Sequence, residues 1–576
     1  MSRRRQRAKR RRRGLMGAAG PAVTWLMGRS ADKFMKQTGR FAAASQETLD
    51  KILAMSRGTE YGRRCGLDGA APRKVFETLP TTTYSDYAPY IERMAAGEQN
   101  VLCTDPIIFF STTSGTTGPP KMIPVTKPIM RLTLIEKFVS AGLAYRAGAL
   151  KPMHGPMMTI MTEHLSGLTA GGVPKGAATT GGFKNMGPVG DMILSSPAEV
   201  MRVHDQKASR YLHLLFGLRH EHLWTILAFF PATILFCMRD LQAQSEQLLR
   251  DLADGTINPD LELPTEIRTS LAQRLRPDRA RARALTNLLE SDRFDVPHIW
   301  PDMGCILTAT GGGFRFYADQ LRPFLGDVPI FSPIYSASES SVGYGYSLEN
   351  PYYLLLPESS YLELLPEEQI DDPEARPIPA WQAKPGSSYE VIVTTMSGFL
   401  RYRLHDIVRV VDFLHQTPIV EFVERQGQLI DVVGEKTAEH HIAEAIAAAC
   451  YRVKARLLDY FVSPDTEQTP ASYLLAIESW QSGSKNSQLI RELLGAVEAS
   501  LRQVAPDYDE ERELGTLGPM ALAVLKPGAF ERLREKRIEA GGAANQIKTP
   551  HVIPDPGFLR KQFKHEILSH FHIKDR

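Results

Sequence analysis

A run of hydroxyl-bearing residues and glycines between positions 111 and 121 has the composition of a phosphate-binding loop. The segment Ser111-Thr-Thr-Ser-Gly-Thr-Thr-Gly-Pro-Pro-Lys121 directly follows the strand-like run IIFF. Its hydroxyls donate hydrogen bonds, its glycines let the backbone approach a ligand closely, and Lys121 supplies a positive charge. It is not a Walker A motif, because it lacks the Gly-Lys-Ser/Thr sequence and prolines precede the lysine. A Ser/Thr/Gly linker has a similar composition, but the adjacent strand and the apolar residues after Lys121 favour a polyphosphate-binding loop.

Two further segments place a carboxylate where it suits a nucleotide. Glu339 lies in a small-residue and aromatic segment, Pro333 to Tyr346, where a carboxylate can hold Mg²⁺ and a ring can pack on a base. Asp406 ends the alternating run GFLRYRLHD, and a carboxylate at a strand end can accept hydrogen bonds from both hydroxyls of a ribose. Taken singly, each acid is more often a solvated turn residue.

These segments, together with two more near the C-terminus, resemble a known family. The order along the chain is STTSGTTGPPKMIPVT, YSASES, GFLRYRLHDIVRV, VVGEKTAE and NQIKTP. This order is similar to that of the acyl-acid amido synthetases of the auxin-responsive Gretchen Hagen family. That family belongs to the adenylate-forming superfamily, with firefly luciferase and the acyl-CoA synthetases. The resemblance covers roughly residues 35–570.

The resemblance implies a two-step reaction that uses ATP and Mg²⁺. A carboxylic acid attacks the α-phosphate of ATP to form an acyl adenylate and pyrophosphate, and an amine, commonly that of an amino acid, then displaces AMP to form an amide. Fixed hydrogen-bond donors, a metal ion and a mobile cation suit this chemistry. Two alternatives stay open on the residues alone. One is a ligase that passes the acyl group to coenzyme A or a carrier-protein thiol, and the other is a nucleotide-binding protein without catalysis.

The resemblance also implies that the hydroxyl-rich loop holds the phosphates of ATP. The residues with a catalytic role in that loop are Thr113, Ser114 and Thr116. The loop residues expected to bind ATP beside them are Gly115, Thr117 and Lys121.

Four residues of the middle segments take the remaining nucleotide-binding roles that the resemblance implies. Tyr335 packs on adenine, and Ser338 and Glu339 match the Ser-Glu pair of the family, with Glu339 as the contact to Mg²⁺. Asp406 binds the ribose.

Two lysines of the C-terminal segments complete the expected site, and two histidines depart from the family pattern. Lys436 in GEKTAE stands where the family changes domain and contacts the nucleotide, and Lys548 in NQIKTP is the lysine that stabilises the adenylation transition state. His405 replaces the glycine that usually precedes the ribose-binding acid, and His551 replaces the arginine that usually follows Lys-Thr-Pro.

The elements that position these residues alternate between strand-like and helix-like, which indicates an α/β fold. The sequence predicts strands within 101–110, 157–161 and 306–310, and it predicts two long helices over 211–250.

Changes in the sequence pattern along the chain predict three parts. Residues 1–24 are expected to form a basic, disordered tail, and residues 25–430 a large N-terminal domain that binds ATP and the acyl acid. This domain has several subdomains with mixed sheets, and seven short apolar runs between 352 and 433 predict an antiparallel subdomain within it. Residues 431–576 are expected to form a small, mobile α/β lid domain.

The composition excludes several classes of protein. With 43% hydrophobic and 23% charged residues, the 576-residue chain is globular rather than disordered or fibrous. It has 68 Lys and Arg against 65 Asp and Glu, and nine of the cations lie in the first thirteen residues. The rest of the chain is therefore slightly acidic, which argues against a specific nucleic-acid partner.

Cysteine spacing and hydropathy indicate where the protein acts. Five widely spaced cysteines without a C-x-x-C pair are typical of a reducing compartment. The longest uncharged stretch, Leu223 to Met238, is too short to span a membrane. The sequence therefore predicts a cytoplasmic enzyme whose partners are a small-molecule carboxylic acid and an amine, and it predicts neither their identity nor an oligomeric state.

Overall fold

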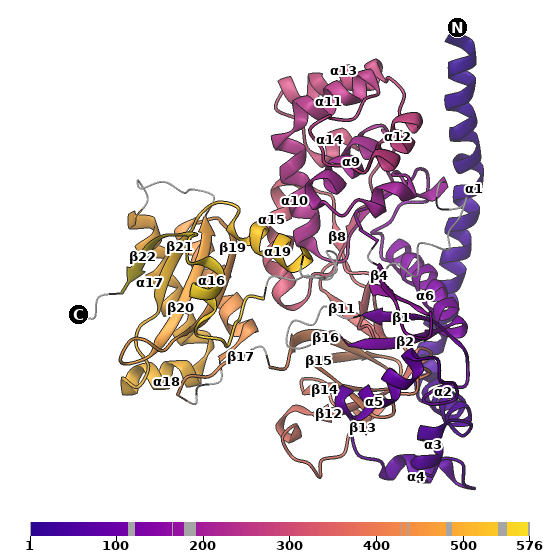
Figure 1. Ribbon diagram of the computed structural model, residues 1–576, viewed down its shortest axis with the longest axis vertical. Coiled ribbons are helices and arrows are strands. Elements are labelled where there is room, and N and C mark those ends of the chain that lie inside the picture. The colour runs from indigo at the N-terminus through magenta and orange to yellow at the C-terminus, as the bar shows by residue number, and fades with distance from the viewer. Residues whose placement is uncertain are drawn as a thin grey trace. The chain divides into compact units, whose positions relative to one another are not determined.

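The structure is a computed structural model of the chain, and it shows two compact units that are described separately below (Figure 1). The first unit extends to Phe422 and the second begins at Val423, whereas the sequence predicts a boundary at 430. Side chains are described from residue 20 onward. The structure describes residues 2–112, 121–163, 165–177, 190, 192–427, 429–433, 435, 437–479, 487–539 and 550–573.

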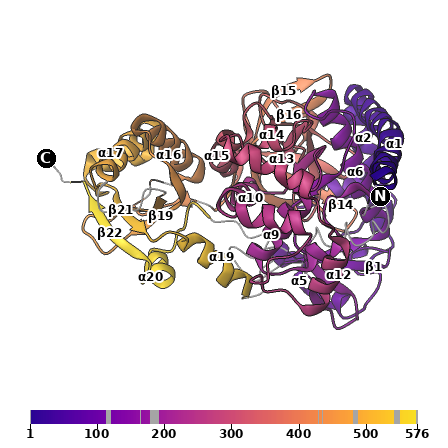
Figure 2. The same cartoon turned by 90° about the horizontal axis from the view of Figure 1, so that it is seen from above.

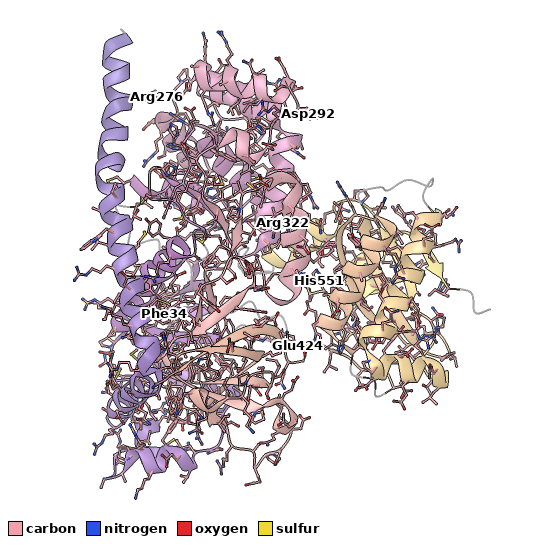
Figure 3. All side chains as sticks on the ribbon, turned by 180° about the vertical axis from the view of Figure 1, so that it is seen from behind. Phe34, Arg276, Asp292, Arg322, Glu424 and His551 are labelled. Atoms are coloured by element: carbon pink, nitrogen blue, oxygen red, sulfur yellow. The ribbon has the colours of Figure 1, made fainter. Side chains whose placement is uncertain are left out.

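The first unit opens with a long helix, α1 (Ser2–Gln37). The segment 1–24, expected to be disordered, lies in this helix from Ser2 onward, and the arginines and alanines that dominate it are good helix formers. The C-terminal part of α1 packs along α6 (Lys127–Arg146), as Figures 1 and 2 show. Phe34, marked in Figure 3, contacts Tyr344 edge to face at 4.9 Å between ring centroids.

The helical part of the first unit contains a parallel sheet with strand order β3-β6-β7-β8, of which β8 is labelled in Figure 1. Its short strands are almost entirely apolar because helices cover them, as expected for a parallel sheet. The strands are β3 (Met157–Thr159), β6 (Thr225–Leu227), β7 (Cys305–Leu307) and β8 (Ile330–Phe331). The helices that share a hydrophobic core with it are α9 (Gln206–Leu218), α10 (Pro231–Ala243), α11 (Ser245–Asp254), α13 (Arg279–Glu290) and α15 (Arg315–Leu325).

This sheet confirms the strands predicted near 157 and 306, but the prediction of two long helices over 211–250 is wrong. That segment contains the end of α9, the strand β6, the helix α10 and the first part of α11. A buried strand of three residues inside an apolar stretch is too short to show alternating polar and apolar residues. Its sequence pattern therefore cannot be distinguished from that of a buried helix.

A second, mixed sheet carries the hydroxyl-rich loop. Its strand order is β2-β1-β5-β4, and β1 pairs antiparallel with β2, with Thr112 opposite Met122. The chain therefore leaves β1 and re-enters β2 at facing positions on either side of residues 113–120. The strands are β1 (Ile107–Thr112), β2 (Met122–Thr126), β4 (Leu165–Leu168) and β5 (Pro174–Ala177).

The third sheet has eight strands in the order β13-β12-β14-β15-β16-β11-β10-β9. It confirms the predicted antiparallel subdomain, with the runs at 399–404 and 407–411 joined into the single strand β15. The strands are β9 (Ile334–Ser336), β10 (Ser341–Gly345), β11 (Tyr352–Leu355), β12 (Ser360–Pro366), β13 (Ile378–Pro379), β14 (Ser388–Thr395), β15 (Tyr402–Leu414) and β16 (Thr417–Arg425).

The second unit is a small α/β body with strand order β19-β20-β21-β22. The pair β20 and β21 is parallel, and the two outer pairs are antiparallel. With it, the predicted α/β class with mixed sheets and an antiparallel subdomain is confirmed. The strands are β19 (Leu457–Asp465), β20 (Ser472–Ser479), β21 (Ala521–Leu525) and β22 (Ile567–His572), and the helices include α16 (Glu439–Val453), α17 (Ser487–Val504), α18 (Pro506–Leu514) and α19 (Ala529–Glu539).

Candidate functional site

The structure describes part of the predicted site. The predicted residues that it describes lie in the first unit, and they are Lys121, Tyr335, Ser338, Glu339 and Asp406. The predicted residues that lie outside the described part of the chain are Thr113, Ser114, Gly115, Thr116, Thr117, Lys436 and Lys548.

Lys121 and Glu339 are connected through Tyr402, a residue that sequence reasoning did not single out. Lys121 Nζ lies 3.4 Å from the Tyr402 hydroxyl, and that hydroxyl donates a hydrogen bond to Glu339 Oε1 at 3.1 Å. Tyr402 is the first residue of β15 and lies on its buried face. A cation from the end of the hydroxyl-rich loop and a carboxylate from another segment therefore meet at one buried phenol.

A second tyrosine, Tyr84, supports Lys121 from α5 (Tyr84–Ala95). The lysine ammonium lies over the Tyr84 ring, 5.5 Å from its centroid, where the negative face of the ring attracts a cation. The Tyr84 hydroxyl accepts a hydrogen bond from the Met122 backbone N–H at 2.9 Å. Burial, aided by the charge of Glu339, raises the pKa of Tyr84 and keeps its hydroxyl protonated.

Tyr335 of β9 and Asp406 of β15 meet although they lie on different strands of the eight-stranded sheet. The Tyr335 hydroxyl donates a hydrogen bond to Asp406 Oδ2 at 2.9 Å. The Tyr335 ring contacts Phe422 of β16 edge to face at 5.5 Å and Tyr353 of β11 at 5.7 Å. The predicted adenine contact and the predicted ribose contact are therefore neighbours.

A bulge in β15 directs Asp406 toward Tyr335. Between the pairs Glu390–Ile407 and Ile392–Arg403, β14 advances by two residues while β15 advances by four. The extra residues fit because His405 adopts a left-handed conformation with φ of 60°. Glycine adopts this conformation without strain, which explains why glycine suits the position that His405 occupies.

The buried carboxylate of Glu390 secures this bulge. Its Oε1 accepts a hydrogen bond from the His405 backbone N–H at 3.1 Å and lies 3.3 Å from His405 Nδ1. Arg403 Nη2 donates to Oε2 at 2.5 Å. Burial alone would raise the pKa of Glu390, but the hydrogen bonds from His405 and Arg403 lower it below its usual range. Sequence reasoning missed Glu390, and the available signal was an acid inside the apolar strand SYEVIVTT.

The turn between β9 and β10 carries Ser338 and Glu339. The Ala337 backbone N–H donates to the Ser340 carbonyl at 2.9 Å, which closes the turn, and both side chains are half-buried. Mg²⁺ in nucleotide sites is commonly bound by one or two carboxylates, water and substrate phosphates. Among the described residues no group of three or more His, Cys, Asp or Glu could hold a metal. The carboxylate of Glu339 is a ligand of this kind.

The carboxyl edge of the parallel sheet lies beside the same region. After β7 the chain turns at Gly311, where an added Cβ would lie 3.6 Å from Phe422, the residue that contacts Tyr335. Nearby on this edge, Phe230 stacks on Phe314 at 5.2 Å. Ligands of α/β sheets bind outside the carboxyl ends of parallel strands, so this edge is a suitable border for the site.

In the second unit, His551, labelled in Figure 3, is buried. Its ring stacks on Tyr460 at 4.1 Å, and Nε2 lies 3.4 Å from Asp459 Oδ1 while Nδ1 lies 3.7 Å from Glu439 Oε1. Its carbonyl accepts a hydrogen bond from the Val462 backbone N–H at 2.7 Å. The histidine therefore anchors residues 550–553 to β19.

Three family models match the chain in sequence order. The GH3 family N-terminal domain matches residues 30–330, the central domain matches residues 353–425, and the C-terminal domain matches residues 440–557. No helix in the described part of the chain combines the length and apolar character needed to cross a bilayer.

Characterised relatives are similar over almost the whole chain. The jasmonoyl-L-amino acid synthetase JAR4 of Nicotiana attenuata is 28% identical over 528 residues, which is 88% of this chain and 90% of the relative. The indole-3-acetic acid-amido synthetase GH3.8 of Oryza sativa subsp. indica is 27% identical, covering 93% of this chain and 92% of the relative.

Solved structures show the same architecture. The GH3.15 acyl acid amido synthetase in complex with 2,4-DB superimposes with a TM-score of 0.83 at 25% identity, covering 94% of this chain and 97% of that chain. A 2-hydroxyisobutyryl-CoA ligase in complex with its acyl adenylate has a TM-score of 0.50 at 11% identity, covering 94% of this chain and 90% of that chain, which shows a likeness of fold alone.

Proposed function

The chain belongs to the GH3 family, and on this basis we propose which of its residues carry out each step of the family reaction. The protein is an ATP-dependent acid–amine ligase of the AMP-forming type. It activates a carboxylic acid as an acyl adenylate and transfers the acyl group to an amine, which gives an amide, AMP and pyrophosphate.

The proposal for the nucleotide is carried by one observation: side chains from three separate segments converge and are joined by hydrogen bonds. Tyr335 contacts Asp406 directly, and Tyr402 connects Lys121 to Glu339. An aromatic ring, a strand-end acid, a carboxylate and a cation are the groups that adenine, ribose, a magnesium ion and a phosphate require. Tyr335 therefore binds adenine and Asp406 binds the ribose, with Ser338 beside Glu339 in the turn.

In the first step, a carboxylate oxygen of the substrate acid attacks the α-phosphorus, and the bond to the bridging oxygen breaks so that pyrophosphate leaves. Thr113, Ser114 and Thr116 donate hydrogen bonds to the phosphates, with Gly115, Thr117 and Lys121 nearby. Glu339 would hold Mg²⁺ together with the phosphates, and the ion would supply positive charge for the leaving pyrophosphate.

Two lysines of the C-terminal segments also act on the nucleotide. Lys548 stabilises the charge that develops on the α-phosphate during adenylation, and Lys436 contacts the nucleotide.

In the second step, the amine nitrogen attacks the carbonyl carbon of the adenylate, AMP leaves with the bonding electron pair, and the nitrogen loses a proton. Tyr335 and Asp406 retain the AMP moiety during this step. The acid and the amine are of the kinds that the relatives use, small carboxylic acids and amino acids.

ATP–pyrophosphate exchange measured across a panel of carboxylic acids tests the first step. At least one acid is expected to support exchange in the presence of Mg²⁺. ATP binding without exchange for any acid in a broad panel would leave only a nucleotide-binding protein.

The acceptor is tested with product masses. Incubation of the activated acid with amino acids, with coenzyme A and with a carrier-protein thiol is expected to give an amide and no thioester. A thioester as the main product would identify the protein as a ligase that forms acyl thioesters instead of amides.

A cytoplasmic location is proposed from the cysteines. All five are free, and three of them, Cys103, Cys237 and Cys305, are buried. Free buried thiols persist where glutathione keeps the compartment reducing. Fractionation of cells that express the tagged chain checks this, with the protein expected in the cytosolic fraction and not in a secreted one.

A further inference from the structure

A buried carboxylate on α6 faces the turn that carries Glu339. Glu136 is only 3% exposed, and its Oε2 accepts a hydrogen bond from the Ser341 hydroxyl at 2.7 Å. Ser341 is the first residue of β10, two positions after Glu339. The carboxylate therefore contacts the first residue of β10, where the chain leaves the turn.

One helical turn further along α6, Ser140 holds the chain on the other side of the same hairpin. Its hydroxyl donates to the Pro333 carbonyl at 2.7 Å, immediately before β9. Residues four apart lie on the same face of a helix, so Glu136 and Ser140 act side by side. Both arms of the hairpin are therefore attached to α6 by side-chain hydrogen bonds.

The hairpin itself has few other side-chain attachments near the turn. Ser340 contributes hydrogen bonds to Ser359 at 3.2 Å and Ser360 at 3.0 Å, and Tyr402 holds Glu339 at 3.1 Å. A shift of the β10 end would move Glu339 relative to Tyr402 and hence to Lys121.

The surroundings of Glu136 are polar. The hydroxyls of Ser341 and Ser359 interact with its carboxyl group. The charged and titratable groups that face it are Lys137 on α6, Glu358 before β12 and Tyr344 on β10. Burial raises the pKa of Glu136 more than the hydroxyls of Ser341 and Ser359 lower it.

We propose that Glu136 is a positioning residue for the turn that carries Glu339, because it fixes the end of β10 through Ser341. This inference rests on the proposed role of Glu339. Loss of the attachment would let the turn move and would weaken magnesium-dependent adenylation.

The first test compares Glu136→Gln with Glu136→Leu in ATP–pyrophosphate exchange at increasing Mg²⁺. Glutamine keeps the acceptor for Ser341 without a charge, so this variant is expected to retain wild-type exchange at neutral pH. Leucine removes the acceptor and is expected to lower exchange or the apparent affinity for Mg²⁺ by about 10–100-fold, the usual effect of losing an outer-shell partner. Ser341→Ala is expected to cause a similar loss, with little further loss in the double variant.

The magnesium dependence separates positioning from a merely structural role. It is measured in exchange and, independently of activity, as Mg²⁺ binding in the presence of ATP. Wild-type magnesium dependence in Glu136→Leu with an intact fold by circular dichroism would overturn the proposal.

Two control variants make the result specific. Ser270→Ala removes a hydrogen bond of 2.8 Å to Glu199 elsewhere in the first unit and is expected to leave exchange unchanged. Glu339→Gln reports on the proposed function itself. Wild-type exchange in Glu339→Gln would refute the role of Glu339, whereas a loss there with none in Glu136→Leu would refute only the inference about Glu136.

Discussion

The Tyr335 hydroxyl donates a hydrogen bond to Asp406. Tyr335 lies on β9 and Asp406 lies on β15, and three other strands lie between these two in the sheet. Adjacent strands lie about 4.8 Å apart, so β9 and β15 would be about 19 Å apart in a flat sheet. The sheet must therefore curl strongly, and the Tyr335 ring lies across the hollow, in contact with Tyr353 and Phe422 from two of the intervening strands. Curvature of this sheet brings together the two residues proposed to bind adenine and ribose.

Variants of Tyr335 test which part of the side chain matters for ATP. Tyr335→Phe removes one hydrogen bond, worth about 1 kcal/mol, so the KM for ATP is expected to rise by about fivefold. Tyr335→Ala also removes the ring and is expected to raise it further. Pyrophosphate exchange at varied ATP measures both values. Equal KM values for Tyr335→Ala and wild type would exclude the ring from adenine binding.

The left-handed residue before Asp406 gives a second prediction. His405→Val places a β-branched residue at φ of 60°, which costs about 1–3 kcal/mol, and should also raise the KM for ATP because the bulge aims Asp406. His405→Gly fits the same backbone and should keep a KM near that of the wild type. Urea unfolding and exchange kinetics measure the two effects.

His415 supplies the matched control for this experiment. It has φ of 56° in the turn between β15 and β16. His415→Val is expected to lose similar stability without a change in the KM for ATP. If the valine and glycine variants at position 405 behave alike, the left-handed backbone does not determine the position of Asp406.

The parts of the site that the sequence predicts are those with local signals. Asp406 ends an alternating run, and Glu339 stands in a turn between apolar segments, so both were identified from neighbours in the sequence. Tyr402 and Glu390 were not, because their roles depend on side chains more than ten residues away. Alternation predicts that Tyr402 is buried, but it carries no information about which acid accepts its hydroxyl.

The strands and helices that the sequence predicts are likewise those with local signals. The antiparallel runs after residue 352 alternate and are separated by turn residues, so most of those strands were predicted, although the bulge that merges two of them into β15 was not. The strand β6 was missed because it has three residues between two helices. Curling of the sheet depends on packing among residues far apart in sequence, which composition does not describe.

A buried ion pair beside the site predicts a large loss of stability. Arg401 and Glu363 are 6% and 3% exposed, and Arg401 Nη2 lies 2.8 Å from Glu363 Oε1. Glu363→Leu leaves the guanidinium buried without its counter-charge, so unfolding free energy is expected to fall by about 3–5 kcal/mol. Denaturant titration measures this change.

The exposed pair Arg409 and Glu421 provides the comparison. Glu421→Leu is expected to cost less than about 1 kcal/mol, because solvent screens exposed pairs. Equal losses in the two variants would mean that burial does not determine the effect.

Buried His213 predicts a loss of stability in acid. Burial lowers the pKa of His213 to about 4, below its ordinary value of 6.5, and its Nδ1 lies 2.9 Å from the Ser196 hydroxyl. The unfolded chain therefore binds a proton before the folded chain does as the pH falls. The resulting stabilisation is complete above pH 6.5 and declines by about 3 kcal/mol on the way to pH 4. His213→Asn should remove this part of the pH dependence, and equal slopes for both proteins between these pH values would contradict it.

Lys548→Ala is expected to separate the two chemical steps. The α-phosphorus becomes five-coordinate only while the acid attacks ATP, whereas the amine later attacks the carbonyl carbon of the finished adenylate. A lysine placed at the α-phosphorus therefore stabilises the first transition state more than the second. Its loss should slow adenylation by about 10²–10³, the usual effect of losing one positioned transition-state contact. Amide formation from a presynthesised adenylate should be spared. Lys526→Ala, which removes a hydrogen bond of 2.7 Å to the His565 carbonyl in the same unit, should change neither step. An equal loss in both steps of the Lys548 variant would show that the lysine supports the bound nucleotide rather than the adenylation transition state.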